Sequence, residues 1–111
     1  MIKRDISFNK GDSRPFKLRV LMANGEYLSL IGNEKLVFDV RATASSTPIL
    51  TKECPNGGIT HDSAENYFRF VIEPQDTEQM CVEKPYEYTI KFYSPANDTI
   101  ITVVGGELEL K

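Results

Sequence analysis

The sequence predicts an all-β protein, an immunoglobulin-like antiparallel β-sandwich of about seven to nine strands with one short helical turn near residues 74–80. Apolar residues recur with a period of two along most of the chain, and turn residues separate these runs about every ten residues. No helical pattern is long enough to cover a parallel sheet. A chain of 111 residues without internal repeats has the size of one domain, so we expect residues 1–111 to share a single core.

The strands are predicted from runs in which apolar side chains alternate with polar ones, as in strands with one buried face. These runs contain, in order, Ile2, Ile6 and Phe8; Phe16, Leu18, Val20 and Met22; Leu36, Phe38, Val40 and Ala42; Phe68, Phe70 and Ile72; Tyr86, Tyr88, Ile90 and Phe92; Leu108 and Leu110. The stretch 99–104 is apolar or threonine at both parities, which is typical of a strand in the middle of a sheet or of one covered by a partner.

The boundaries of these runs carry turn residues. Asn24 and Gly25 are predicted to form a two-residue hairpin turn, and the Asn-Gly-Gly sequence at 56–58 and the residues 94–98 give further turn signals. All six prolines stand at the edges of the runs, where a missing amide hydrogen does not interrupt a ladder.

Residues 74–80 interrupt the strand pattern with a proline and a short acidic stretch. We expect this segment to cross from one sheet to the other at the end of the core, with Pro74 at the first helical position and Met80 packed onto the sheet ends. Tyr86 opens the next strand. Its hydroxyl is hypothesised to bond to the upstream backbone, as in the tyrosine corner of Greek-key sandwiches, and the alternative is an ordinary core aromatic.

Composition narrows the classes of function. The net charge is −3 and the basic residues are scattered, so we expect no nucleic-acid partner. No segment approaches the roughly 20 apolar residues of a membrane span, and the N-terminus has no apolar core of signal-peptide length, so we expect synthesis in the cytoplasm and no membrane association. Cys54 and Cys81 fit no metal-ligand spacing and are expected to be reduced.

Several short motifs, taken together, resemble the N-terminal domain family of phage baseplate upper proteins and related tail modules. The motifs are Lys10-Gly11-Asp12, the segments 25–32 and 37–41, the Pro-Gln-Asp-Thr sequence at 74–77, the Tyr-Glu-Tyr strand at 86–88, the Thr-rich strand at 98–103 and the closing glycine strand at 105–110. The family commonly has a glycine before the Tyr-x-Tyr strand, whereas this chain has Glu83-Lys84-Pro85. The resemblance implies a non-catalytic virion component of a tailed phage or prophage, assembled in the bacterial cytoplasm, whose partners are other tail proteins or copies of itself.

Residues capable of catalysis do not converge in the sequence. His61 is the single histidine, and Asp62 and Glu65 follow it in a polar stretch typical of a solvated turn. Ser63 lies too near His61 in the sequence for a catalytic triad. We therefore predict no enzyme activity, no catalytic residues, no metal site and no cofactor.

The remaining candidate residues belong to surfaces. Ile101 and Val103 are expected to be buried by a partner, and Tyr27, Tyr67 and Tyr93 are the tyrosines free to point outward. Two interpretations remain open. One is a structural and interaction module, and the alternative is a carbohydrate-binding or adhesin-like sandwich, which needs outward aromatics gathered in one place.

Overall fold

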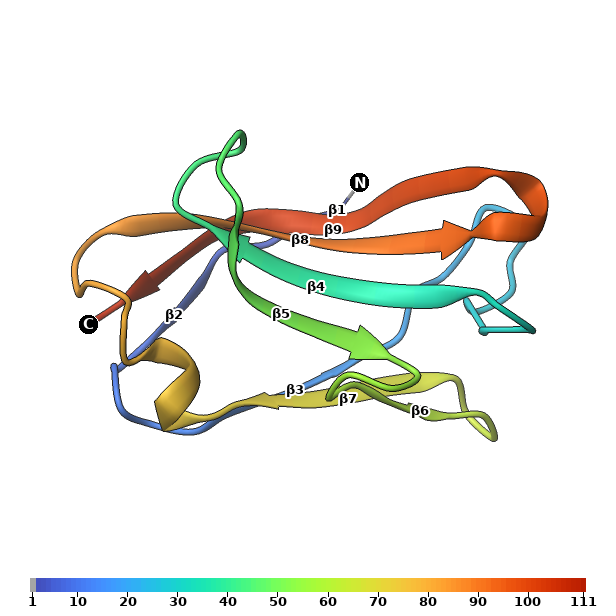
Figure 1. The fold of residues 1–111 in the computed structure, drawn as a ribbon. Helices are drawn as coiled ribbons and strands as arrows, with labels where there is room; N and C mark the ends of the chain where they lie inside the picture. Colours follow the sequence, from blue (N-terminus) through green and yellow to red (C-terminus); the bar gives the residue numbers. More distant parts are fainter. Residues whose placement is uncertain (1) are drawn as a thin grey trace.

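The chain forms two β-sheets packed face to face in a computed structural model, which describes residues 2–111 apart from the side chain at position 97 (Figure 1). Within these residues the larger sheet has the order β1-β9-β8-β4-β5, and β2 also pairs with β9. Its strands are β1 (Ile2–Lys3), β2 (Ile6–Phe8), β4 (Lys35–Arg41), β5 (Pro48–Cys54), β8 (Pro85–Ser94) and β9 (Thr99–Leu110). The smaller sheet has the order β3-β7-β6, from β3 (Arg14–Leu18), β6 (Thr60–Asp62) and β7 (Tyr67–Ile72).

This strand order is that of an immunoglobulin variable-type domain, in which one sheet has strands G, F, C and C′ and the other has B, E and D. The predicted fold class and strand number are therefore confirmed. Most pairings are antiparallel, but β1 and β2 run parallel to β9. Local sequence could not indicate this pairing, because it joins the two extremes of the chain.

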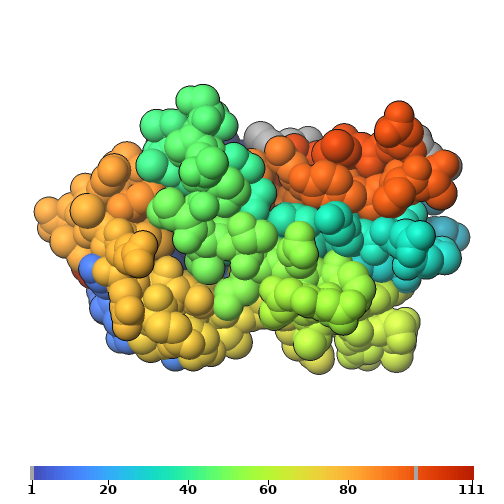
Figure 2. All heavy atoms as spheres, in the orientation of Figure 1, coloured from blue at the N-terminus to red at the C-terminus, as the bar shows by residue number. Residues whose placement is uncertain are grey.

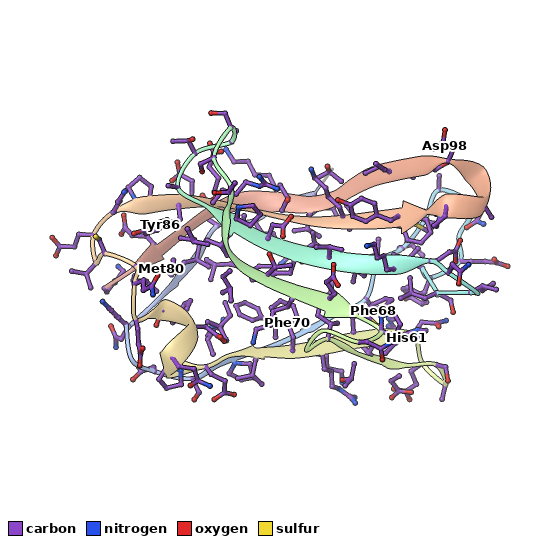
Figure 3. The ribbon with its side chains drawn as sticks, in the orientation of Figure 1. His61, Phe68, Phe70, Met80, Tyr86 and Asp98 are labelled. Carbon is purple, nitrogen blue, oxygen red and sulfur yellow. The ribbon has the colours of Figure 1, made fainter. Side chains whose placement is uncertain are left out.

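The core lies between the sheets and consists of the apolar residues at alternate strand positions. Phe38 and Phe68 are fully buried, and the Phe38 and Phe70 rings from opposite sheets lie 4.8 Å apart between centroids. Figure 3 shows Phe68 and Phe70 between the two layers. Burying each large side chain contributes about 1.5–3 kcal/mol to the stability of the fold. Strands with apolar residues at every second position bury one face each, so two such sheets pack together with those faces inward.

A short 3-10 helix, η1 (Pro74–Thr77), joins β7 of the smaller sheet to β8 of the larger one. The Asp76 carboxylate accepts a hydrogen bond from the Glu73 amide at 2.8 Å and pairs with Lys52 Nζ at 2.9 Å. Met80 is 2% exposed and the Tyr86 hydroxyl accepts a hydrogen bond from the Cys81 amide at 2.7 Å, at the end of the sandwich labelled in Figure 3. The predicted helical turn, the packing of Met80 and the tyrosine corner are all confirmed.

The prediction that a partner buries Ile101 and Val103 is wrong for Val103, which is already buried within this chain. The β8–β9 pairing shifts by one residue, so that Ile90 pairs with Val104 and Lys91 with Thr102, and Val103 is the extra residue of a β-bulge. Val103 is 7% exposed and belongs to the core. It therefore has no side-chain surface for a partner to cover.

The predicted hairpin turn at Asn24 and Gly25 is present, with Leu21 and Tyr27 forming an antiparallel bridge around it, but its loop is longer than the predicted two residues. Positive φ occurs at Gly25 alone of these two residues, and the Met22 amide donates to Glu26 O at 2.8 Å across a longer loop. The alternation of Val20 and Met22 consequently belongs to the 19–34 connection, whereas β3 ends at Leu18.

The N-terminal segment crosses β9 at very short range. A Cβ atom at Gly106 would lie 2.2 Å from Arg4 O, so only glycine permits this crossing. The Tyr88 hydroxyl, on β8, donates a hydrogen bond to the same Arg4 carbonyl, and Asp5 Oδ1 accepts from the Glu107 amide at 3.0 Å. These contacts hold the junction between β1 and β2 against the larger sheet.

Neither cysteine forms a disulfide: Cys54 is buried and Cys81 exposed. The helical segments within residues 2–111 are all too short to cross a membrane.

Candidate interaction surface

Four connections lie toward one end of the sandwich, which we call the loop end: residues 19–34, 55–59, 63–66 and 95–98 (Figure 1). Residues 19–34 and 95–98 occupy the places of the B–C and F–G loops, which belong to the recognition end of variable-type immunoglobulin domains. The last of them includes η2 (Pro95–Asn97), and Asp98 follows it at φ 48° at the tip of the β8–β9 hairpin (Figure 3).

Large apolar side chains are exposed at the loop end. The exposed fractions are 75% for Ile31, 65% for Ile100, 61% for Leu21, 40% for Tyr27 and 39% for Ile101. Figure 2 shows the β8–β9 hairpin and the loop near residue 30 at the same end of the molecule. Apolar groups gathered in one region of a surface are typical of protein interaction sites, whereas single ones are ordinary.

Glu34 connects the two loops that carry most of these side chains. Its Oε1 accepts a hydrogen bond from the Ile31 amide at 2.8 Å, and its Oε2 accepts from the Ser94 hydroxyl at 3.2 Å. Because Ser94 pairs with Thr99 at the base of the hairpin, Ile31 is held beside the strand that carries Ile100. The loop end thus has a defined internal scaffold.

Two of the three predicted outward tyrosines meet through a shared cation. The Arg19 guanidinium lies 3.9 Å from the Tyr27 ring centroid and 4.6 Å from that of Tyr67, and Lys17 Nζ lies 4.0 Å from the Tyr67 centroid. Tyr93 lies on the other sheet, with Lys35 Nζ 5.4 Å from its ring. The three tyrosines therefore do not form a single aromatic platform, and cations already occupy faces of these rings.

His61 contacts residues of its own β6–β7 hairpin. The His61 ring stacks on Phe68 with centroids 4.6 Å apart, and its Nε2 lies 3.3 Å from Asn66 Oδ1. Asp62 accepts a hydrogen bond from the Ala64 amide at 3.1 Å in the β6–β7 turn. Among residues 2–111 no three histidine, cysteine or acidic side chains are grouped closely enough to hold a metal ion.

Sequence reasoning missed a cleft between the β1–β2 segment and β3. Its volume is about 440 Å³, with Phe16, Phe70 and Ile90 among the apolar residues that line it. Arg4, Asp5, Arg14, Lys17 and Arg19 also line it. The parallel pairing of β1 with β9 creates this cleft, so the only local signal was the basic character of residues 14–19.

Tyr88 also lines this cleft. Burial raises the pKa of Tyr88, the Asp5 carboxylate raises this pKa further, and the Arg4 guanidinium acts in the opposite direction. Tyr88 therefore stays protonated at neutral pH and able to donate to the Arg4 carbonyl. Burial likewise raises the pKa of the Cys54 thiol.

Comparison with known proteins supports the fold alone. No family model and no curated protein matches the sequence. Among solved structures, the chain is similar to the NK cell receptor Nkp44, described as a triggering partner in natural cytotoxicity, with a TM-score of 0.62, 13% sequence identity and coverage of 100% of both chains. The class that fold and comparison define is the immunoglobulin-like β-sandwich.

Proposed function

We propose that this chain is a non-catalytic interaction module, a tail or baseplate component of a tailed-phage or prophage virion. The loop end is the surface that docks onto another virion protein. The gathering of exposed Ile31, Ile100 and Leu21 at the loop end is the observation that carries the interaction role. The virion assignment is supported by the sequence motifs that resemble baseplate upper proteins.

The size of the loop end supports a protein partner. The sandwich measures 38 × 29 × 24 Å, and the product of the two shorter extents, 29 × 24 Å, gives an end face of roughly 700 Å². A standard protein interface buries about 800 Å² on each partner. The end face therefore offers an area close to that of a specific interface.

The carbohydrate-binding alternative receives less support. A sugar platform needs free ring faces gathered in one place, but Arg19 contacts both Tyr27 and Tyr67, and Tyr93 lies on the opposite sheet. A glycan array with no bound sugar is the expected result.

The test is incorporation into phage particles from bacteria that carry the gene, measured by mass spectrometry. We expect Ile31→Asp combined with Ile100→Asp to reduce incorporation at least tenfold, because a charge buried in an apolar interface is strongly disfavoured. Ile49→Asp is the matched control, because Ile49 is 48% exposed and lies on β5 at the other end of the sandwich. The control should be incorporated normally.

Equal incorporation of the double variant and the control would place the docking surface elsewhere. Absence of the wild-type protein from particles would remove the virion assignment. The other possible partner is a second copy of this chain, and sedimentation of the purified protein tests it. Self-association that the double variant abolishes would assign the loop end to contacts between copies of this chain.

A further inference from the structure

We propose that the cleft between β1–β2 and β3 binds an extended acidic segment of a partner protein, which adds a strand to the free edge of β3. This inference rests on the proposed interaction role but concerns a different surface from the loop end. It is carried by three features of the cleft: an unpaired strand edge, an apolar interior and a basic rim.

The unpaired edge belongs to β3. This strand pairs with β7 on one side, and within residues 2–111 no strand pairs with its other side. Immunoglobulin domains place strand A at that position. Pro15 has no amide hydrogen, and a proline in an edge strand places its nitrogen toward the open side.

The direction of the Lys17 backbone groups follows from the direction of the Pro15 nitrogen. Backbone bonding directions alternate along an antiparallel strand, so the N–H and C=O of Lys17 face the open side as well. Arg14 Nη1 donates to Pro15 O at 3.3 Å, which agrees with that carbonyl facing away from β7. The edge thus offers Lys17 N–H, Lys17 C=O and Pro15 C=O to an added strand.

The interior of the cleft suits the side chains of an extended segment. In a strand, alternate side chains point to one face, so every second side chain of the added strand would enter the space between the sheets. That space is lined by Phe16, Phe38, Phe70, Ile90 and Val104. Aliphatic residues at alternate positions therefore fit the cleft, and strand addition with side-chain pockets is an established mode of peptide recognition.

Charge selects an acidic segment. Four basic residues, Arg4, Arg14, Lys17 and Arg19, line the cleft with one acidic residue, Asp5. The chain as a whole has a net charge of −3, so this positive region is local. Opposite charge across an interface steers association and excludes wrong partners.

The test is an NMR titration of the isotope-labelled protein with a short peptide of alternating glutamate and leucine. We expect saturable shifts of the Lys17 amide and of residues around Val104, with binding that weakens as salt is raised. Arg4→Glu combined with Arg14→Glu should weaken binding roughly tenfold or more. Lys91→Glu on β8, which does not line the cleft, is the control and should change the affinity by less than about twofold.

Two further peptides keep the test decisive if the double variant folds poorly. The same peptide with lysine in place of glutamate tests charge, and a backbone N-methylated version tests strand pairing; both should bind at least tenfold more weakly. Equal binding of either peptide, or no saturable shift, overturns the proposal. Shifts confined to Ile31 and Ile100 also overturn it, while leaving docking through the loop end intact.

Discussion

The two ends of the sandwich cover their apolar side chains in different ways. The end opposite the loop end, which we call the corner end, is formed by η1 and the segment 78–86 that follows it. There Met80 and Tyr86 are buried, with exposed fractions of 2% and 3%. At the loop end, Ile31 and Ile100 remain 75% and 65% exposed. The corner end thus buries Met80 and Tyr86 and leaves Val82 49% exposed, whereas the loop end leaves five large apolar side chains exposed to water. This exposure costs free energy that a docking partner would remove.

The corner end should be the more sensitive to truncation. Met80→Ala removes a fully buried side chain beside the core and should lower the free energy of unfolding by about 3 kcal/mol. Urea denaturation measures this directly. A loss below about 1 kcal/mol would show that the corner end is not closed as described.

The tyrosine corner contributes a smaller amount. Tyr86→Phe leaves the Cys81 amide without its hydroxyl acceptor and should cost about 1 kcal/mol. Tyr93→Phe serves as the control, because Tyr93 is a half-buried tyrosine of the same strand on its outer face. Equal stability of wild type and Tyr86→Phe would mean that the hydrogen bond makes no net contribution.

Alkaline pH should weaken the attachment of the N-terminal segment, because the Tyr88 hydroxyl donates a hydrogen bond to the Arg4 carbonyl. The pKa of Tyr88 is raised in the folded state, so its stabilising effect is complete below the unfolded value of about 10 and is lost as pH rises through the folded value. The unfolding free energy of the wild type should therefore fall as pH rises above about 10, and less so in Tyr88→Phe. Cys54 titrates in both proteins, so the difference between them isolates Tyr88. Parallel pH profiles would argue against this role.

The loop end should show the smallest effect on folding. Ile31→Ser and Ile100→Ser replace exposed side chains, so each should change the free energy of unfolding by less than about 0.5 kcal/mol. Thermal or urea unfolding checks this. A loss above about 1 kcal/mol would mean that these side chains serve the fold rather than docking.

The sequence alone predicted those parts of the fold that depend on local pattern. Period-two alternation indicated the strands, and the proline and acidic residues at 74–77 indicated the crossing between sheets. The position of Tyr86 after that crossing was enough to suggest its hydrogen bond. Each of these features is specified within about ten residues, where side-chain direction follows directly from parity.

The remaining features depend on contacts between distant parts of the chain. The bulge at Val103 reverses the parity of β9, and nothing local marks it, so the prediction for Val103 was wrong while Ile101 stayed partly exposed. The meeting of Tyr27 with Tyr67 through Arg19 joins the 19–34 connection to β7, about 40 residues further along the chain. The cleft beside β3 exists because the N-terminus pairs with the last strand, which periodicity cannot reveal.

The claim that the loop end is a docking surface is tested most directly by hydroxyl-radical footprinting of the wild-type protein, free and in assembled particles. We predict that oxidation of Ile31 and Ile100 falls at least fivefold on assembly, because a partner excludes water from them, while oxidation of the control residue Ile49 is unchanged. Unchanged oxidation of Ile31 and Ile100 in particles that contain the protein would contradict the account.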